Sequence, residues 1–381
     1  MPKCPSCGKE VKEEDEFCSR CGAELTMEEQ QPIPEEIEEE VRGLVEQDFS
    51  IEDSWMEDER LVFEVRPRFS VKRNFPRLKS RLAKIDKVPF LREREGKLRL
   101  YILPKAPTKG DRVIINIILF LATIGTTLFV GYQMSSGLVE IGFMKDPWQG
   151  AILFSAGIIG VLGCHELGHK IAASRRGVRS SLPYFIPVPF AIGTFGAIIY
   201  QKEFASSRND LFDIAMAGPI LGFMVLLPVT VLGIRLSYII PLERVPEGTI
   251  GLPLPLIFQF LLNAMVSIPS GYTMLFHPLA FVGWVGMIVT MLNLMPAGML
   301  DGGHVSRVIF GGRMHRIVSY IASAITFILG FWPMAILMLL FSMQPHPGPL
   351  EEVTPLTTSR KVAALLLAAI LVLCAAPLTI F

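Results

Sequence analysis

Long apolar runs separated by short polar loops fill the chain after Arg112, whereas the residues before it are predominantly polar and charged. A bilayer core of about 30 Å requires roughly 20 apolar residues in a helix. Six runs of this kind predict transmembrane helices over 113–134, 148–173, 211–234, 279–299, 317–341 and 362–381. Two further apolar stretches, 182–200 and 252–268, are interrupted by prolines, so their length alone leaves open whether they cross.

Positive charge beside these runs predicts their orientation, because cytoplasmic loops carry an excess of Lys and Arg. A basic cluster follows the second span, which is therefore expected to run towards the cytoplasm; the cluster consists of Arg175, Arg176 and Arg179. Basic residues lie on both sides of 182–200, so a re-entrant hairpin is favoured there over a crossing. Arg307 follows the fourth span, which also runs towards the cytoplasm provided that 252–268 does not cross as a single helix.

Short alternating and helical patterns organise the polar part. Residues 61–65 alternate as in a strand, 75–82 have helical spacing, and two β-like stretches follow. These patterns predict a small soluble α+β domain over 61–105. Residues 25–60 are acidic and hold few apolar anchors, so they are predicted to form a solvated linker with at most one short amphipathic helix.

Four of the six cysteines form two Cys-x-x-Cys pairs near the N-terminus, and the other two lie in apolar segments, which argues against disulfides. Each pair can present two thiolates to one metal, and the glycine after each pair lets backbone N–H groups face them. The spacing predicts a structural zinc ribbon over 1–24 with zinc bound by Cys4, Cys7, Cys18 and Cys21. Four unligated thiols are the alternative, and a redox role lacks the surrounding βαβ pattern.

The composition supports a membrane protein, because 51% of the 381 residues are hydrophobic and the mean hydropathy is +0.45. The formal net charge is zero, and basic residues of the polar part are interleaved with acidic ones. Nucleic-acid binding is therefore not expected. No cleavable signal peptide is visible at the N-terminus, so the polar domains are expected on the cytoplasmic side of the membrane.

The second predicted span carries the densest chemistry. His165 and His169 are four residues apart, which places both imidazoles on one helix face, as two ligands of one metal require. Glu166 lies beside them, where a carboxylate can accept a proton from metal-bound water. Each charged group at the bilayer centre costs roughly 2.5–3.5 kcal/mol. Three ionisable groups within two turns therefore indicate a metal or a partner rather than chance.

A catalytic zinc needs a third protein ligand and leaves one position open for water. Asp301 is the candidate, because it ends the fourth span where Pro296 and glycines interrupt the helix, and broken helices at membrane depth line polar cavities. His304 is an alternative ligand, although a solvated loop histidine is the simpler interpretation. Asn293 is a candidate for positioning the scissile carbonyl or its developing oxyanion, with hydrogen bonding between helices as the alternative.

Over about 113–316 the chain resembles the site-2 proteases, in particular the branch found in archaea and plant plastids. The resemblance rests on His165-Glu166-Leu167-Gly168-His169, Gly193-Thr194-Phe195-Gly196-Ala197, Ala217-Gly218-Pro219, His277-Pro278-Leu279 with Gly283-Trp284, and Asn293 with Pro296 and Leu300-Asp301-Gly302. It implies that zinc is bound by His165, His169 and Asp301 and that Glu166 is the catalytic base. No PDZ-like insertion or CBS-like tail is apparent, so substrate selection, through a protein partner, is expected to fall to the zinc ribbon.

We therefore expect an α-helical polytopic membrane protein with about six transmembrane helices, re-entrant segments, a zinc ribbon and a small soluble α+β domain, its membrane domain covering 106–381. The expected function is zinc-dependent intramembrane cleavage of transmembrane protein substrates, as in regulated intramembrane proteolysis. The 182–200 hairpin, including Gly196, is expected to hold an unwound substrate by edge pairing. A membrane metal-ion transporter and a catalytically inactive membrane scaffold are the alternatives.

Overall fold

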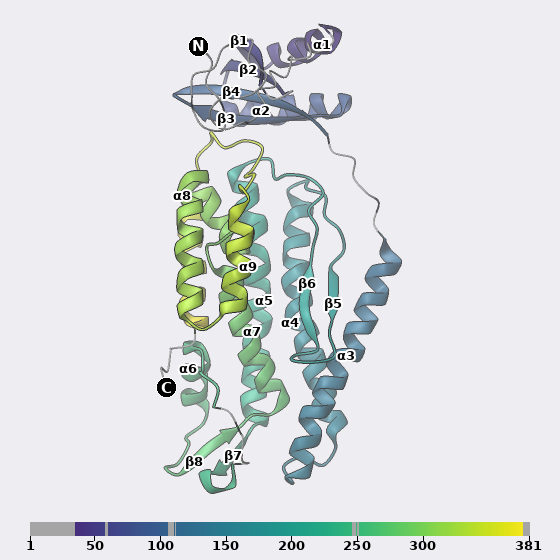
Figure 1. The fold of residues 1–381 in the computed structure, drawn as a ribbon, viewed down its shortest axis with the longest axis vertical. Helices are drawn as coiled ribbons and strands as arrows, with labels where there is room; N and C mark the ends of the chain where they lie inside the picture. The colour runs from purple at the N-terminus through teal and green to yellow at the C-terminus, as the bar shows by residue number, and fades with distance from the viewer. Residues whose placement is uncertain are drawn as a thin grey trace, which may run out of the picture. The chain divides into compact units, whose positions relative to one another are not determined.

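A computed structural model describes residues 35–57, 60–105, 110, 112–245, 249 and 251–375 (Figure 1). Contacts divide the chain into two units, Met1–Lys105 and Ala106–Phe381, at the position where hydropathy changes. The zinc ribbon predicted over 1–24 lies outside the described residues.

The N-terminal unit is built on a four-stranded antiparallel sheet with the strand order β1-β2-β4-β3. Its helix α1 packs on β1 and α2, and α2 packs on β3. The core is formed by apolar side chains of the strands and helices, and Phe63 of β2 and Leu100 of β4 are fully buried. The elements are α1 (Glu35–Glu46), β1 (Phe49–Glu57), β2 (Arg60–Pro67), α2 (Val71–Leu82), the 3-10 turn η1 (Ala83–Ile85), β3 (Lys87–Arg94) and β4 (Lys97–Pro104).

The prediction of a linker over 25–60 is wrong where β1 stands, whereas the predicted short amphipathic helix is present as α1. Helix α1 buries Val41 and Val45, and β1 pairs along its length with β2, so the domain begins at Glu35 or earlier. The hydropathy pattern does not indicate β1, because β1 is an edge strand. Phe49 is fully buried, while most of the following side chains are charged or polar and partly exposed. Charged residues are a common feature of edge strands, where they discourage pairing with other chains.

The membrane unit is mainly helical, with two short two-stranded antiparallel sheets. Helix α4 packs between α3 and α5, and α7 packs against α5 and α4. The elements are α3 (Val113–Glu140), α4 (Pro147–Arg175), β5 (Tyr184–Pro187), β6 (Thr194–Ile198), α5 (Arg208–Leu236), β7 (Tyr238–Pro241), the 3-10 turn η2 (Leu242–Arg244), α6 (Leu256–Met265), β8 (Tyr272–Leu275), α7 (Pro278–Leu294), α8 (Asp301–Ile328), α9 (Trp332–Met343) and α10 (Thr358–Cys374).

Three helices of the described residues, α3, α4 and α5, are long and apolar enough to cross a membrane. Helices α7 and α10 contain 17 residues each, which corresponds to about 25 Å and falls short of a bilayer core of about 30 Å. The predicted number of six spans is therefore not confirmed, although the apolar, helical character of the unit is.

The span predicted over 317–341 is wrong, because two helices occupy it. Helix α8 ends at Ile328, the chain turns, and α9 returns beside α8 (Figure 1). Gly330 adopts a φ of +83° at the turn, and a proline stands at the start of α9. Glycine just after a helix and proline just inside the next one are the usual chemical signals for such a break.

The hairpin predicted over 182–200 is confirmed in its geometry. Strands β5 and β6 pair antiparallel, and a bridge between Ser180 and Gln201 joins the two ends of the segment. The other ambiguous stretch holds only α6, whose 10 residues extend about 15 Å and cannot cross a bilayer. The condition that 252–268 does not cross as a single helix is therefore met.

The assignment of β1 to the soluble domain can be tested by removing its anchor. We expect Phe49→Ala to lower the free energy of unfolding of this domain by about 3–5 kcal/mol, because Phe49 is fully buried. The measurement is hydrogen exchange of the β2 and β4 amides in the full-length protein. Phe69→Ala is the control, because this side chain is 72% exposed and should change little. Equal hydrogen exchange of these amides in the two variants would contradict the assignment of β1 to the soluble domain.

Candidate metal centre

Helices α4 and α8 bring together three side chains that can bind a metal. His165 and His169 occupy one face of α4, one turn apart, and Asp301 is the first residue of α8. One donor atom from each residue lies within 4.8 Å of the others. Among the described residues, no other group of three or more His, Cys, Asp or Glu side chains lies close enough together to hold one ion.

The distances between the donor atoms fit a tetrahedral metal ion. The Nε2 atoms of His165 and His169 are 3.1 Å apart, and each lies 3.2 Å from one carboxylate oxygen of Asp301. A tetrahedral metal with bonds of about 2.0–2.1 Å separates two of its donors by about 3.3 Å. The three side chains are at most 16% exposed, so few water molecules can contact them.

A backbone contact orients one of the imidazoles. The Nδ1 atom of His169 lies 2.8 Å from the carbonyl oxygen of Ile214 on α5 and donates to it. This contact places the ring proton on Nδ1 and leaves the lone pair of Nε2 directed at the cluster. The ring is therefore held in the tautomer that a metal requires.

Glycines allow α4 and α5 to approach closely at this level. A β-carbon at Gly218 would overlap the ring of His169, and one at Gly222 would lie 3.0 Å from the β-carbon of His165. On the facing helix, a β-carbon at Gly168 would lie 2.5 Å from the carbonyl oxygen of Ala217. The two histidines can occupy their positions only because α5 presents no side chain there.

Asp301 is positioned by a tight turn rather than by the end of a long helix. Helix α7 stops at Leu294, so Asp301 begins α8 instead of ending the predicted span 279–299. Gly302 and Gly303 pack directly on backbone carbonyls of the turn, where a β-carbon would overlap Leu294 or Gly298. The first turn of a helix also favours a carboxylate, because the helix dipole is positive there.

A cavity of about 220 Å³ opens onto the three donors and contains further predicted residues. Glu166 lines it, next to the backbone of Ile199 that follows β6. Asn293 lines it from the last turn of α7, and its side chain makes no hydrogen bond with another described residue. Gly196 does not line the cavity, although the next residues of β6 do; it has a φ of +102°.

His304 does not join the three donors, and its expected place in a solvated loop is wrong. It lies in the first turn of α8, faces the cavity, and its Nδ1 is 2.7 Å from Nε2 of His346. The buried His315 packs against His346 and hydrogen-bonds to Ser306. No local pattern could have revealed this cluster, because His304 and His346 are separated by 42 positions.

The buried cluster within apolar helices defines a membrane-embedded protein with a candidate metal centre. Residues 153–340 match peptidase family M50, and residues 3–25 match a zinc-ribbon domain. The membrane part of the chain therefore contains a stretch similar to peptidase family M50, which confirms the resemblance to the site-2 proteases. The second match confirms the prediction of a zinc ribbon at the N-terminus.

Curated relatives of this chain include plastid proteins. The probable zinc metalloprotease EGY1, chloroplastic, of Arabidopsis thaliana is 29% identical over 295 residues, which cover 70% of this chain and 53% of the relative. The EGY1 protein of Oryza sativa subsp. japonica is 32% identical over 244 residues, which cover 57% of this chain and 41% of the relative. The chain thus spans about half the length of these curated relatives or less. No solved structure matches it.

Close packing of α5 on His169 predicts a metal-binding defect. We expect Gly218→Ala to displace the imidazole and to remove the metal of the membrane unit, while the ribbon keeps its own. Gly160→Ala on α4 is the matched control, because a β-carbon there meets nothing within 4 Å. Elemental analysis of the purified full-length variants measures the bound metal. Full metal content in Gly218→Ala would show that the imidazole of His169 does not need the space beside Gly218.

Proposed function

We propose that the chain is a zinc-dependent endopeptidase that cleaves peptide bonds within or near transmembrane segments of membrane-protein substrates. The observation that carries the proposal is the convergence of His165, His169 and Asp301 at distances that suit a tetrahedral ion, with Glu166 lining the same cavity. The match of residues 153–340 to peptidase family M50 supports the reaction class. The names of the plastid relatives, probable zinc metalloproteases, support zinc as the metal.

Three protein donors and one open position are typical of catalytic zinc rather than structural zinc. When bound, zinc supplies a Lewis acid that polarises a carbonyl oxygen and lowers the pKa of a coordinated water towards about 7. His165, His169 and Asp301 hold the ion. The contact between His169 and Ile214 keeps one ligand in the required tautomer.

Glu166 is proposed as the general base and then as the general acid. A carboxylate oxygen takes a proton from the attacking water, the water oxygen bonds to the peptide carbon, and the C–N bond breaks as the proton passes to the leaving nitrogen. Because Glu166 is adjacent to His165 in α4 but is not among the three clustered donors, it is free for this transfer. Glu166 is half-buried, so bulk water has limited access to it.

Asn293 is proposed to position the substrate. Its amide lies on the cavity wall without a partner among the described residues, so it can donate to the scissile carbonyl and to the oxyanion that develops from it. A role of Asn293 in interhelical hydrogen bonding would require a hydrogen-bond partner on a neighbouring helix.

The hairpin of β5 and β6 is proposed to hold the substrate in an extended form. A transmembrane helix hides its carbonyls in internal hydrogen bonds, so it must unwind locally before hydrolysis. Within the described part of the chain, β6 pairs only with β5, and Ala197 and Ile198 of β6 line the cavity. The unpaired edge can accept an added strand beside the metal centre.

The proposal also assigns sides of the membrane. The basic cluster after α4 supports a cytoplasmic location for this end, for the α+β domain and for the ribbon. The ribbon is then available to a cytoplasmic protein partner that selects substrates. Release of a cytoplasmic fragment after such a cut is the chemical basis of regulated intramembrane proteolysis.

Replacement of Glu166 separates a protease from a metal transporter. We expect Glu166→Ala to keep the zinc of the membrane unit and to reduce peptide cleavage by about 10²–10⁴-fold. His169→Ala should lose both, because it removes a ligand. The assays are elemental analysis and cleavage of a single-span substrate in detergent. Loss of zinc in Glu166→Ala would instead support a transporter that uses the carboxylate as a ligand, and normal cleavage would remove Glu166 from the mechanism.

The role of the β6 edge predicts a variant that binds zinc but cleaves poorly. Gly196 has a positive φ, so Gly196→Val should distort the edge and reduce cleavage at least tenfold without zinc loss. Gly142→Val is the matched control, because Gly142 also has a positive φ and open space but lies in the loop between α3 and α4. Full activity in Gly196→Val, or equal loss in both variants, would contradict edge binding.

A further inference from the structure

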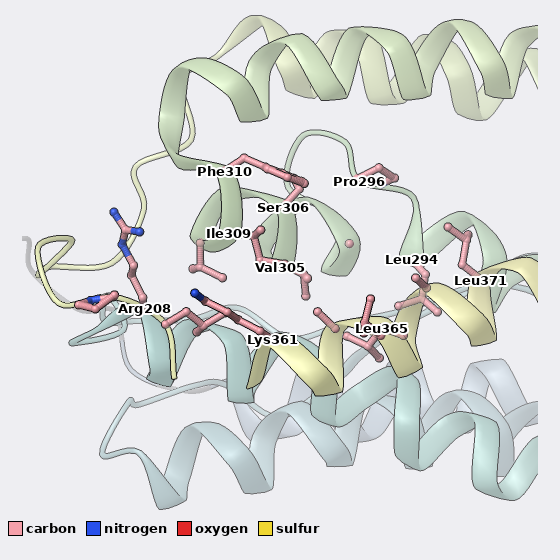
Figure 2. A pocket seen from close by; sticks show the side chains of 17 residues that line it. Arg208, Leu294, Pro296, Val305, Ser306, Ile309, Phe310, Lys361, Leu365 and Leu371 are labelled. Atoms are coloured by element: carbon pink, nitrogen blue, oxygen red, sulfur yellow. The ribbon is translucent and has the colours of Figure 1, made fainter. Parts of the chain in front are cut away.

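A second and larger cavity lies on the other side of the first turns of α8. It has a volume of about 600 Å³ and runs between α8 and α10 (Figure 2). Its wall is mainly apolar, with Val305 and Ile309 from α8 and Leu365 from α10. Apolar side chains at its rim are exposed, including Leu365 at 70% and Phe310 at 53%. In a bilayer, such an opening faces lipid rather than water.

Two cations lie towards one end of this apolar cavity. Arg208 from the start of α5 and Lys361 from the first turn of α10 both line it, while Leu294 and Leu371 lie towards the other end (Figure 2). Neither cationic side chain makes an ion pair or hydrogen bond with another described residue. The cavity is therefore amphipathic along its length, with positive charge at one end and hydrocarbon at the other.

Neighbouring acidic groups do not neutralise these two cations. Asp213 is paired with Arg176 and Arg360, and Glu352 is paired with Arg307. Lys361 also lies at the same end of the bundle as Arg176, since Arg360 and Arg176 share one carboxylate. Glu351, which lies beside Ser207, accepts a hydrogen bond from the amide of Thr354, and among the described residues no carboxylate forms an ion pair with Arg208 or Lys361.

The two ends of the cavity favour an occupant that is charged at one end and apolar along the rest of its length. A flexible acyl chain can follow the apolar wall while its anionic headgroup remains at the charged end.

We propose that this cavity binds an anionic phospholipid, with its phosphate at Arg208 and Lys361 and an acyl chain along the apolar wall between α8 and α10. Basic pockets between membrane helices are a known type of site for anionic headgroups. The inner wall includes Gly302 and Leu294, which pack on each other beside Asp301. A bound chain would support the turn that carries Asp301 from the side opposite to the metal cavity.

The test measures lipid binding and does not require proteolysis, so failure of the proposed function leaves it intact. Full-length protein is reconstituted in nanodiscs of equal phosphatidylglycerol and phosphatidylcholine, and retained lipids are counted by native mass spectrometry. Wild type should retain phosphatidylglycerol preferentially. Arg208→Gln with Lys361→Gln should reduce this preference roughly 25-fold, because each cation near anionic lipid contributes about fivefold.

Two further variants make the result specific. Arg313→Gln with Arg316→Gln removes the same charge from exposed positions of α8 outside the cavity and should keep the preference. Ala364→Trp fills the cavity and should lose retained lipid of both headgroups. The helical content of each variant, measured by circular dichroism, reports that the membrane unit is folded.

Three results would overturn the proposal. The first is equal retention of the two lipids by wild type, and the second is an unchanged preference in the Arg208→Gln and Lys361→Gln variant. The third result concerns the occupant of the cavity. The proposal predicts that a photoreactive residue at position 365 cross-links to lipid. Cross-linking to a transmembrane substrate peptide, or to the chain's own residues 376–381, would assign the cavity to that segment instead.

Discussion

Two imidazole nitrogens and two carboxylate oxygens converge at about 3.1–3.2 Å inside an apolar helix bundle, and this crowding is the constraint on which the structure depends. Lone pairs that face one another at such distances repel unless a cation lies among them. Each charged group at membrane depth also costs roughly 2.5–3.5 kcal/mol on insertion scales. A bound divalent metal would remove both difficulties, so the neighbouring architecture can be understood as support for the three proposed ligands.

That support comes from backbone more than from side chains. Gly218 and Gly222 bring α5 against the histidines, and the Ile214 carbonyl orients one ring. Gly302 and Gly303 let the start of α8 press on the turn that follows α7. Because neither place has a side chain that could adjust, small changes of volume there should move the ligands directly.

Local periodicity is enough to predict the pair of imidazoles on α4, because His165 and His169 must share a face of any helix. Asp301 was predicted from topology and from the broken helix around it, and the structure does bring it to the histidines. The contacts from Gly218 and Ile214 could not be predicted, since they depend on which helix lies beside α4. Hydropathy alone does not indicate the turn at Gly330, because the neighbouring residues are apolar. It does not indicate β1 either, because an edge strand exposes charged side chains.

The most direct test of the account is to locate the peptide bonds that the protein cuts. Purified full-length protein would be incubated with candidate single-span substrates, with and without a zinc chelator, and the products mapped by mass spectrometry. The account predicts cuts within or beside the apolar segment that disappear with the chelator. Cuts confined to soluble segments, or cuts that persist after zinc removal, would contradict an intramembrane metalloprotease.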